Sequence, residues 1–192
     1  MTWLVAGLGN PGPAYATTRH NIGAMVVEAF AQKSRSTLAR HKRALALSCE
    51  THVGIPGALE KVVLAVPLSF MNESGGPVKA LMDFYGVDPG SLVVVHDELD
   101  IDFSTLRVKF GGGDNGHNGL KSIRRSIDTG DFYRERVGVG RPPGRQEPAD
   151  FVLSPFSPTE RKELPSVIDH SVDALESLIL HGLESTQSRF NS

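Results

Sequence analysis

The sequence contains a single cysteine and no long apolar segment. Cys49 has no second cysteine with which to form an internal disulfide, which is typical of a protein from a reducing compartment. The longest apolar runs, such as residues 92–95, are far shorter than the ~20 residues needed to span a bilayer. The first six residues lack the basic start and the cleavage site of a secretory signal peptide. We therefore expect a soluble, cytoplasmic protein that does not contact a membrane.

The chain also lacks a strong net charge, which is −2. This near balance excludes a uniformly basic protein, but the charges are unevenly distributed. Residues 105–145 hold nine Lys and Arg against four Asp and Glu, and residues 33–43 hold five basic residues and no acidic one. The stretch 159–184 is acidic. Such asymmetry is compatible with one basic face that binds a polyanion, although a mixed, solvated surface would show the same pattern.

Length and composition are those of an ordinary globular protein. The chain has 192 residues, of which 40% are hydrophobic and 22% charged. This is enough for one well-buried core and short for two, so the sequence predicts a single domain over residues 1–192. Disordered and fibrous classes are excluded by the same composition.

Apolar runs and helical periodicities alternate along the chain. The expected strands are residues 3–8, 44–53, 61–66, 92–95, 105–110 and 133–139. The expected helices carry periodic apolar residues over 22–30, 78–85, 120–127 and 168–181. Some neighbouring strands are joined too briefly to be parallel. The sequence therefore predicts an α/β fold with a mixed, twisted β-sheet and helices on both of its faces.

Several residues indicate where these helices begin and end. Gly86, Gly130 and Gly182 stand where a helix stop is expected. The segment SPTE at residues 157–160 has the pattern of a capping box with proline at the first helical position. Pro165, a few residues later, is expected to end or kink that segment before the last helix begins.

The segment GLGNPG at residues 7–12 matches a G-x-G-x-x-G fingerprint after a strand, which suggests dinucleotide binding. In that site a helix opens at the glycines, so that its amides face the pyrophosphate. Here Pro11 and Pro13 flank the last glycine, and the helical periodicity starts only at Ile22. No acidic residue stands about 20 positions later at the end of a second strand, where it would hold the ribose. A nicotinamide or flavin oxidoreductase is therefore disfavoured, and we expect no cofactor.

Four polar segments lie beside the predicted elements. They are residues 17–23 with His20, 67–75 with Asn72, 95–100 with Asp97, and the glycine-rich stretch 111–119. Each has an ordinary structural explanation when it is taken alone: a surface histidine, an asparagine cap, an acidic loop and a flexible loop.

Their placement together favours a catalytic site. Asn10, Asn72 and Asp97 each follow an apparent strand, and ligands of α/β sheets bind outside the carboxyl ends of strands. One histidine, one carboxylate and several amides can hydrolyse an ester with activated water. The histidine accepts the proton, the carboxylate fixes its tautomer, and the amides stabilise the oxyanion.

Other hydrolase types fit less well. The sequence has no G-x-S-x-G element for a serine nucleophile. Cys49 lies in a predicted strand with no activating group beside it. His96, Asp97 and His117 could be metal ligands, but their spacing matches no known zinc pattern, so we expect no metal.

Taken in order, these segments resemble the bacterial peptidyl-tRNA hydrolase family. The resemblance covers nearly the whole chain, and six ordered motifs make it much more specific than any one of them. The matching segments are GLGNPG at 7–12 with Tyr15 and TRHNIG at 18–23, FMNESG at 70–75, HDELD at 96–100, GHNGLK at 116–121, RVGVGRP at 136–142 and FVLSPF at 151–156.

The resemblance implies a metal-independent esterase that releases the peptide from peptidyl-tRNA and recycles the tRNA, usually as a monomer. It implies that His20 is the catalytic base and Asp97 its partner. It also places three amides around the peptide end, the 3′-terminal adenosine and the attacking water, without assigning which amide does what; these are Asn10, a further candidate catalytic residue, Asn72 and Asn118.

The resemblance further implies how the tRNA is held. Tyr15 and Met71 would line the site with those amides, and Lys109 and Arg136 match positions that hold the tRNA 5′ phosphate. Residues 144–156, here named the cover segment, and the helix after it match a mobile cover over the substrate channel. The partner is thus the acceptor stem and 3′ CCA end of a peptidyl-tRNA.

Two residues depart from the family pattern. Most relatives have glycine where Asn115 stands, and Asp114 adds a negative charge beside the expected tRNA path. These departures affect the conformation of the loop but not the chemistry. The alternative from another functional class is a non-catalytic RNA-binding module with the same fold, which the presence of both His20 and Asp97 disfavours.

Overall fold

The computed structural model describes residues 1–191. In chain order the elements are β1 (Thr2–Gly7), η1 (Arg19–Asn21), α1 (Ile22–Lys33), β2 (Ala39–Arg40), β3 (Ala46–Ile55), β4 (Ala58–Pro67), η2 (Met71–Glu73), α2 (Gly75–Tyr85), η3 (Pro89–Ser91), β5 (Leu92–Glu98), β6 (Leu106–Phe110), α3 (Asn118–Ile127), β7 (Tyr133–Gly138), α4 (Pro148–Val152), α5 (Pro158–His181) and α6 (Leu183–Phe190). The η elements are single 3₁₀ turns.

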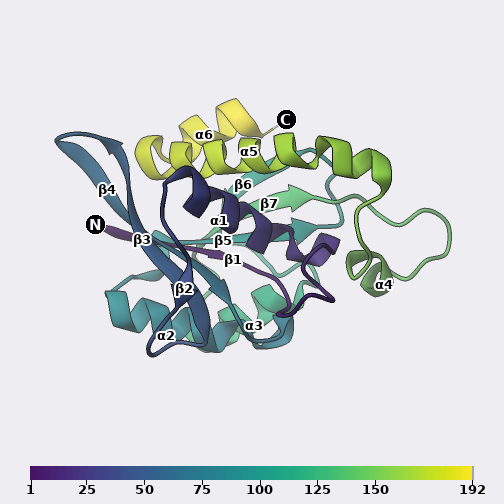
Figure 1. Ribbon diagram of the computed structural model, residues 1–192, viewed down its shortest axis with the longest axis horizontal. Helices are drawn as coiled ribbons and strands as arrows, with labels where there is room; N and C mark the ends of the chain where they lie inside the picture. The colour runs from purple at the N-terminus through teal and green to yellow at the C-terminus, as the bar shows by residue number, and fades with distance from the viewer. Residues whose placement is uncertain (192) are drawn as a thin grey trace.

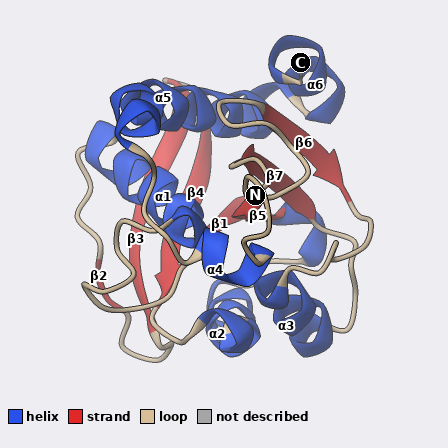
Figure 2. Ribbon diagram, turned by 90° about the vertical axis from the view of Figure 1, so that its right-hand side faces the viewer, coloured by secondary structure: helices blue, strands red, loops and turns tan. Residues whose placement is uncertain are grey.

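The strands form one mixed seven-stranded sheet in the order β2-β3-β4-β1-β5-β7-β6. The central strands β4, β1, β5 and β7 are parallel, whereas β2, β3 and β6 run antiparallel to their neighbours. Helices α1, α5 and α6 lie on one face of the sheet, and α2 and α3 lie on the other (Figures 1 and 2). The predicted α/β fold with a mixed sheet and helices on both faces is confirmed.

Each face of the sheet has its own core because successive strand residues point to opposite sides. Along β1, Trp3 and Val5 pack with α1 and α5, while Leu4 and Ala6 pack with α2 and α3. Residues 3–6 of β1, 62–66 of β4 and 92–95 of β5 are therefore apolar without interruption, as expected for parallel strands covered on both faces.

Two glycines bring α1 into backbone contact with the sheet. A Cβ added at Gly23 would lie 2.1 Å from the carbonyl oxygen of Val95, and one added at Gly7 would lie 2.2 Å from the carbonyl oxygen of Gly23. Hydrogen bonds join the same segments, from Leu8 N to Val95 O (3.0 Å) and from Ala24 N to Leu8 O (3.1 Å). The first turn of α1 is thus fixed directly against the ends of β1 and β5.

The ends of several elements differ from the prediction. The expected strand at 92–95 continues to Glu98, so Asp97 lies inside β5 rather than in a solvated loop after it. The helix expected to close near Gly130 ends at Ile127, because Asp128 already adopts the left-handed conformation (φ 58°). Strand β2 and helices α4 and α6 were not predicted from the sequence.

The expectation for Pro165 is wrong in one respect, because α5 does not end there. The helix runs from Pro158 to His181 without interruption, and Ser157 and Glu160 form the predicted capping box at its start. Proline in a helix costs about 3 kcal/mol, but the apolar stripe that follows packs against α1 and the sheet and offsets this cost. Gly182 ends α5 as predicted, and α6 follows it at once.

Among the helices of residues 1–191, none combines the length and apolarity that crossing a membrane requires.

Candidate active site

A cavity of about 370 Å³ opens at the carboxyl ends of β1 and β5, beneath α4. It lies where the strand order reverses on either side of β1, which is where α/β sheets bind ligands. Six of the predicted site residues are in its lining: Asn10, His20, Met71, Asn72, Asp97 and Asn118. Residues as far apart in the sequence as Asn10 and Asn118 therefore meet at one place.

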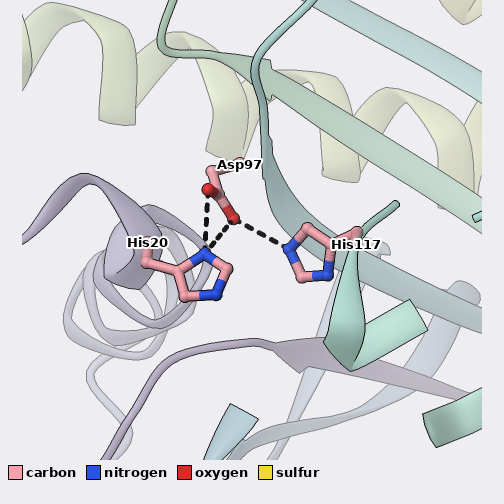
Figure 3. A group of neighbouring side chains, drawn as sticks. All are labelled: His20, Asp97 and His117. Atoms are coloured by element: carbon pink, nitrogen blue, oxygen red, sulfur yellow. Dashed lines mark hydrogen bonds and ion pairs between the residues drawn. The ribbon is translucent and has the colours of Figure 1, made fainter. Parts of the chain in front are cut away.

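His20 and Asp97 form a close pair in this cavity. His20 lies in the turn η1 just before α1, and Asp97 is the second-last residue of β5. The Nδ1 atom of His20 lies 2.9 Å from both carboxylate oxygens of Asp97 (Figure 3). A carboxylate only accepts, so Nδ1 carries a proton, and in the neutral ring the lone pair is on Nε2, which points away from Asp97.

A second histidine contacts the same carboxylate. The Nε2 atom of His117 lies 2.8 Å from Oδ1 of Asp97, on the side opposite His20 (Figure 3). The other ring nitrogen, Nδ1, accepts the backbone N–H groups of Gly119 (3.1 Å) and Leu120 (3.4 Å), so His117 is the N-cap of α3. Sequence reasoning missed this role, because histidine is not among the preferred capping residues and nothing in the pattern distinguishes it.

These contacts fix the charge of Asp97. Burial by itself would raise the pKa of this carboxyl, since the side chain is only 3% exposed. The electrostatic attraction of the His20 and His117 rings and the hydrogen bonds that they donate outweigh burial, and the pKa of Asp97 lies well below its ordinary value. Asp97 is therefore an anion throughout the physiological pH range, with an N–H donor on each side.

His20, Asp97 and His117 are also close enough to be considered as metal ligands, since their donor atoms lie within 4.8 Å of one another. The donor set does not suit a metal. A metal bound at Nε2 of His117 would require a proton on Nδ1, where two backbone N–H groups already point. His96 is not part of this group; its ring is fully buried, and its Nδ1–H donates to the carbonyl of Asp97 (2.7 Å). The arrangement favours a hydrogen-bonded group over a metal centre.

Asn10 is held so that its amide nitrogen is available to the cavity. Its backbone exchanges two hydrogen bonds with the side chain of Asn21, both 2.9 Å long. Its own Oδ1 accepts the backbone N–H of Met71 (2.7 Å). With the oxygen used in this way, the NH₂ group is the part of the side chain that remains to donate to a ligand.

The remaining predicted lining residues differ in exposure. Met71 is buried at the floor of the cavity, whereas Asn72 and Asn118 are exposed at its edges. Tyr15 is not part of the lining; its ring packs edge-on against Phe70, with 6.4 Å between ring centroids. Tyr15 therefore lies next to the site and not in it.

The far wall of the cavity is apolar and comes largely from the cover segment, 144–156. Its contribution consists of Pro148, Ala149, Val152 and Leu153, which lie on or beside α4. In Figure 2, α4 stands between the helices of the two faces.

A second cavity of about 420 Å³ lies beside the first, and charges of both signs line it, including the carboxylates of Glu98, Asp100 and Asp114. Lys109 on β6 and Arg136 on β7 line it, as does the buried Arg134. Burial and the neighbouring arginines lower the pKa of Lys109. The Nε atoms of Arg134 and Arg136 are buried without a hydrogen-bond partner among the described residues. An anion bound there could supply acceptors for these N–H groups.

Asn115 forms part of the wall between the two cavities, together with Glu98. It adopts a left-handed backbone conformation (φ 49°), and its amide donates to Glu98 and to Asp100, both at 2.6 Å. Asp114 forms an ion pair with Arg124 (3.0 Å), which offsets its negative charge. The two departures from the family pattern thus have local partners.

The family model for peptidyl-tRNA hydrolase matches residues 4–192. A peptidyl-tRNA hydrolase of Streptomyces coelicolor is 58% identical over 191 residues, which covers 99% of this chain and 95% of the relative. One of Frankia casuarinae is 56% identical over 190 residues, covering 99% and 94%.

Solved structures give the same result. A crystal structure of peptidyl-tRNA hydrolase with N-propanol matches with a TM-score of 0.87 at 33% identity, covering 100% of this chain and 95% of the other. The enzyme of Acinetobacter baumannii matches with a TM-score of 0.84 at 32% identity, covering 99% and 96%. Sequence and fold therefore agree, and the chain belongs to the peptidyl-tRNA hydrolase family.

Proposed function

We propose that this chain carries out its family's reaction, the hydrolysis of peptidyl-tRNA, with water that is activated by His20. The observation that carries the mechanism is the pairing of His20 Nδ1 with Asp97, which selects the tautomer whose free nitrogen is Nε2 and directs that nitrogen away from the carboxylate. Such a nitrogen at the lining of a cavity is a general base within reach of a bound water molecule.

The reaction proceeds by two proton transfers. Water attacks the carbonyl carbon of the ester that joins the peptide to the tRNA 3′ end, and Nε2 of His20 takes the proton from the water. When the tetrahedral intermediate collapses, the tRNA oxygen leaves and receives that proton from the imidazolium. Asp97 stabilises the imidazolium, and His117 holds Asp97 in place by donating from the other side.

Asn10 is the best candidate for the group that stabilises the oxyanion. Its Oδ1 is occupied by Met71 N, so its NH₂ group can donate to a negative oxygen. A donor of this kind contributes on the order of 10²–10³-fold to the rate. Asn72 and Asn118, at the edges of the cavity, would then bind the 3′-terminal adenosine and the peptide end.

The tRNA would bridge the two cavities. The 3′ CCA end enters the cavity that holds His20, and the peptide lies along the apolar wall formed by Met71 and the cover segment. Lys109 and Arg136 hold the 5′ phosphate of the acceptor stem in the second cavity. We further propose that the protein is a single domain that acts as a monomer in the cytoplasm, where peptidyl-tRNA forms, and needs neither metal nor cofactor.

Replacing His20 tests this proposal. His20→Ala should lower kcat on N-acetyl-aminoacyl-tRNA by about 10²–10⁴-fold and leave binding of the tRNA nearly unchanged, because a general base acts mainly in the transition state. Single-turnover hydrolysis and equilibrium binding measure the two effects separately. Near-normal single-turnover hydrolysis by the variant would remove His20 from this role. An absence of turnover by the wild type would favour a non-catalytic RNA-binding module.

A further inference from the structure

Arg19 is a buried cation directly beside the proposed catalytic base. Its residue is 7% exposed, and its guanidinium makes three kinds of contact. It donates to the carbonyl of Phe151 (3.2 Å), forms an ion pair with Glu160 (2.9 Å), and stacks over the ring of Phe151 at 3.9 Å from the centroid. Placing a charge in the interior is costly, so such a residue is expected to have a specific role there.

These contacts join the turn that carries His20 to the cover segment. Phe151 belongs to α4, and Glu160 belongs to the capping box at the start of α5, so Arg19 connects both ends of the segment between them. The backbone adds to this connection, because Arg19 N donates to Ser154 O (3.1 Å) and Thr18 forms a β-bridge with Pro155. The carboxylate of Glu160 is shared between Arg19 and the N–H of Ser157 (2.8 Å).

The cover segment needs such an anchor. Helix α4 has five residues, and a helix of that length is not stable without tertiary contacts. It nevertheless supplies Pro148, Ala149 and Val152 to the apolar wall of the cavity. The position of that wall therefore depends on what fixes α4 to the rest of the molecule, and Arg19 makes the charged and stacked part of that contact.

We propose that Arg19 is a positioning residue that sets the apolar wall of the cover segment relative to His20, and so determines how well the enzyme binds bulky apolar residues next to the ester. The inference rests on the proposed function. It differs from a purely structural role, because the loss of Arg19 changes the preference among substrates and not only the stability of the fold. The proton transfer of His20 itself does not require Arg19, whose side chain points to α4 and α5.

The test compares two substrates, N-acetyl-phenylalanyl-tRNA and N-acetyl-glycyl-tRNA, on wild type and Arg19→Met. The variant should raise KM for the phenylalanyl substrate by about tenfold, since the apolar contact that it weakens is worth roughly 1–1.5 kcal/mol. It should change KM for the glycyl substrate by less than about twofold and kcat on either substrate by less than about threefold, because the base and its partner are retained.

Arg161→Met is the matched control. Arg161 is also a cation near the start of α5 and donates to one backbone carbonyl, that of Phe156 at the end of the cover segment (3.3 Å), but among the described residues it forms no hydrogen bond or ion pair with α4 or the turn of His20. Its loss should leave the ratio of the two KM values at the wild-type level. If Arg19→Met does not fold, Arg19→Lys replaces it in the test. The lysine keeps a positive charge near Glu160, but it cannot stack on the ring of Phe151 or donate to two partners as the guanidinium does. The ratio of the two KM values should therefore change in the same direction and by less.

The outcomes separate this inference from the proposed function. If the wild type hydrolyses neither substrate, the proposed function is wrong. If the wild type hydrolyses both and the folded Arg19 variant leaves the KM ratio unchanged, only the role of Arg19 is wrong. An equal rise in KM on both substrates would also overturn it, since that result would indicate a general disturbance of the site.

Discussion

Glu135 lies in the protein core although it is a carboxylic acid. It sits on β7 between Val95 and Val108 of the neighbouring strands, on the same face as Val137, and is fully buried. Neither of its carboxyl oxygens has a hydrogen-bond partner among the described residues. Burial raises the pKa of Glu135 well above its ordinary value, so that the group keeps its proton in the folded protein.

This burial makes stability depend on pH. The ordinary pKa of the group is 4.5. As the pH rises above that value, the unfolded chain releases the proton while the folded protein keeps it, so the free energy of unfolding falls by about 1.4 kcal/mol per pH unit. The fall continues up to the raised pKa of the folded state. Glu135→Leu should therefore stabilise the protein, and by more at pH 8 than at pH 5.

Urea unfolding at the two pH values measures this effect, with Glu135→Gln as the control. The amide has nearly the same size and does not titrate, so it should remove the pH-dependent part of the difference without adding an apolar gain. If the gain of Glu135→Leu over the wild type is the same at pH 5 and pH 8, Glu135 does not titrate between them.

At the scale of the element, α3 begins on a residue that also belongs to the active site. His117 caps the helix through Nδ1 and contacts Asp97 through Nε2. His117→Asn should keep the cap, since asparagine is a preferred capping residue, but it is too short to reach Asp97. His117→Ala should lose both contacts and about 1 kcal/mol of stability.

Both variants should lower kcat by about tenfold, because Asp97 loses a charge-assisted hydrogen bond. Thermal unfolding and steady-state kinetics separate the two roles, since only the alanine variant should melt earlier. Wild-type kcat in His117→Asn would show that its contact with Asp97 does not support the reaction.

The sequence was most informative where local pattern decides the element. The capping box at Ser157, the left-handed stop at Gly86 and the buried parallel strands were all predictable from spacing and residue type. The helix through Pro165 was not, because its stability comes from packing against α1, and that packing is a tertiary contact. Helix α4 was also missed, because a segment of five residues is too short to show a helical periodicity of apolar residues.

The candidate site shows the same limit. The polar segments and their order indicated His20, Asp97 and Asn10, which the fold brings to one cavity. The roles of His117 and Arg19 were not predicted, because their partners lie on other elements and no spacing in the sequence links them. Nε2 of His117 contacts Asp97 on β5, and the guanidinium of Arg19 contacts α4 and α5. Such pairings become visible only when the elements are assembled.

At the scale of the whole molecule, the two cavities should act as separate parts of one tRNA site. Replacing Lys109 and Arg136 with methionine should raise KM on tRNA that carries its 5′ phosphate and leave kcat nearly unchanged, because phosphate contacts position the substrate. The slope of log(kcat/KM) against log salt should weaken by about one unit per lost contact at most. On tRNA without the 5′ phosphate the effect should be small.

Arg125→Met provides the control for charge alone, since Arg125 is an exposed cation of α3 and lines neither cavity. Any rise in KM caused by Arg125→Met should be the same on tRNA with its 5′ phosphate and on tRNA without it. Equal losses for the Lys109 and Arg136 double variant on both forms would reject the phosphate role and leave the two residues as general contributors to the basic surface.

The backbone contact among Gly7, Gly23 and Val95 also bears on how such sequences can diverge. The spacing between the turn of His20 and the strand of Asp97 is set by main-chain atoms, with no side chain between them. Core side chains can therefore be exchanged over generations without moving the catalytic pair, and a structure only 33% identical still matches with a TM-score of 0.87. A single methyl group at position 7 or 23, in contrast, would collide with backbone atoms and force His20 and Asp97 apart.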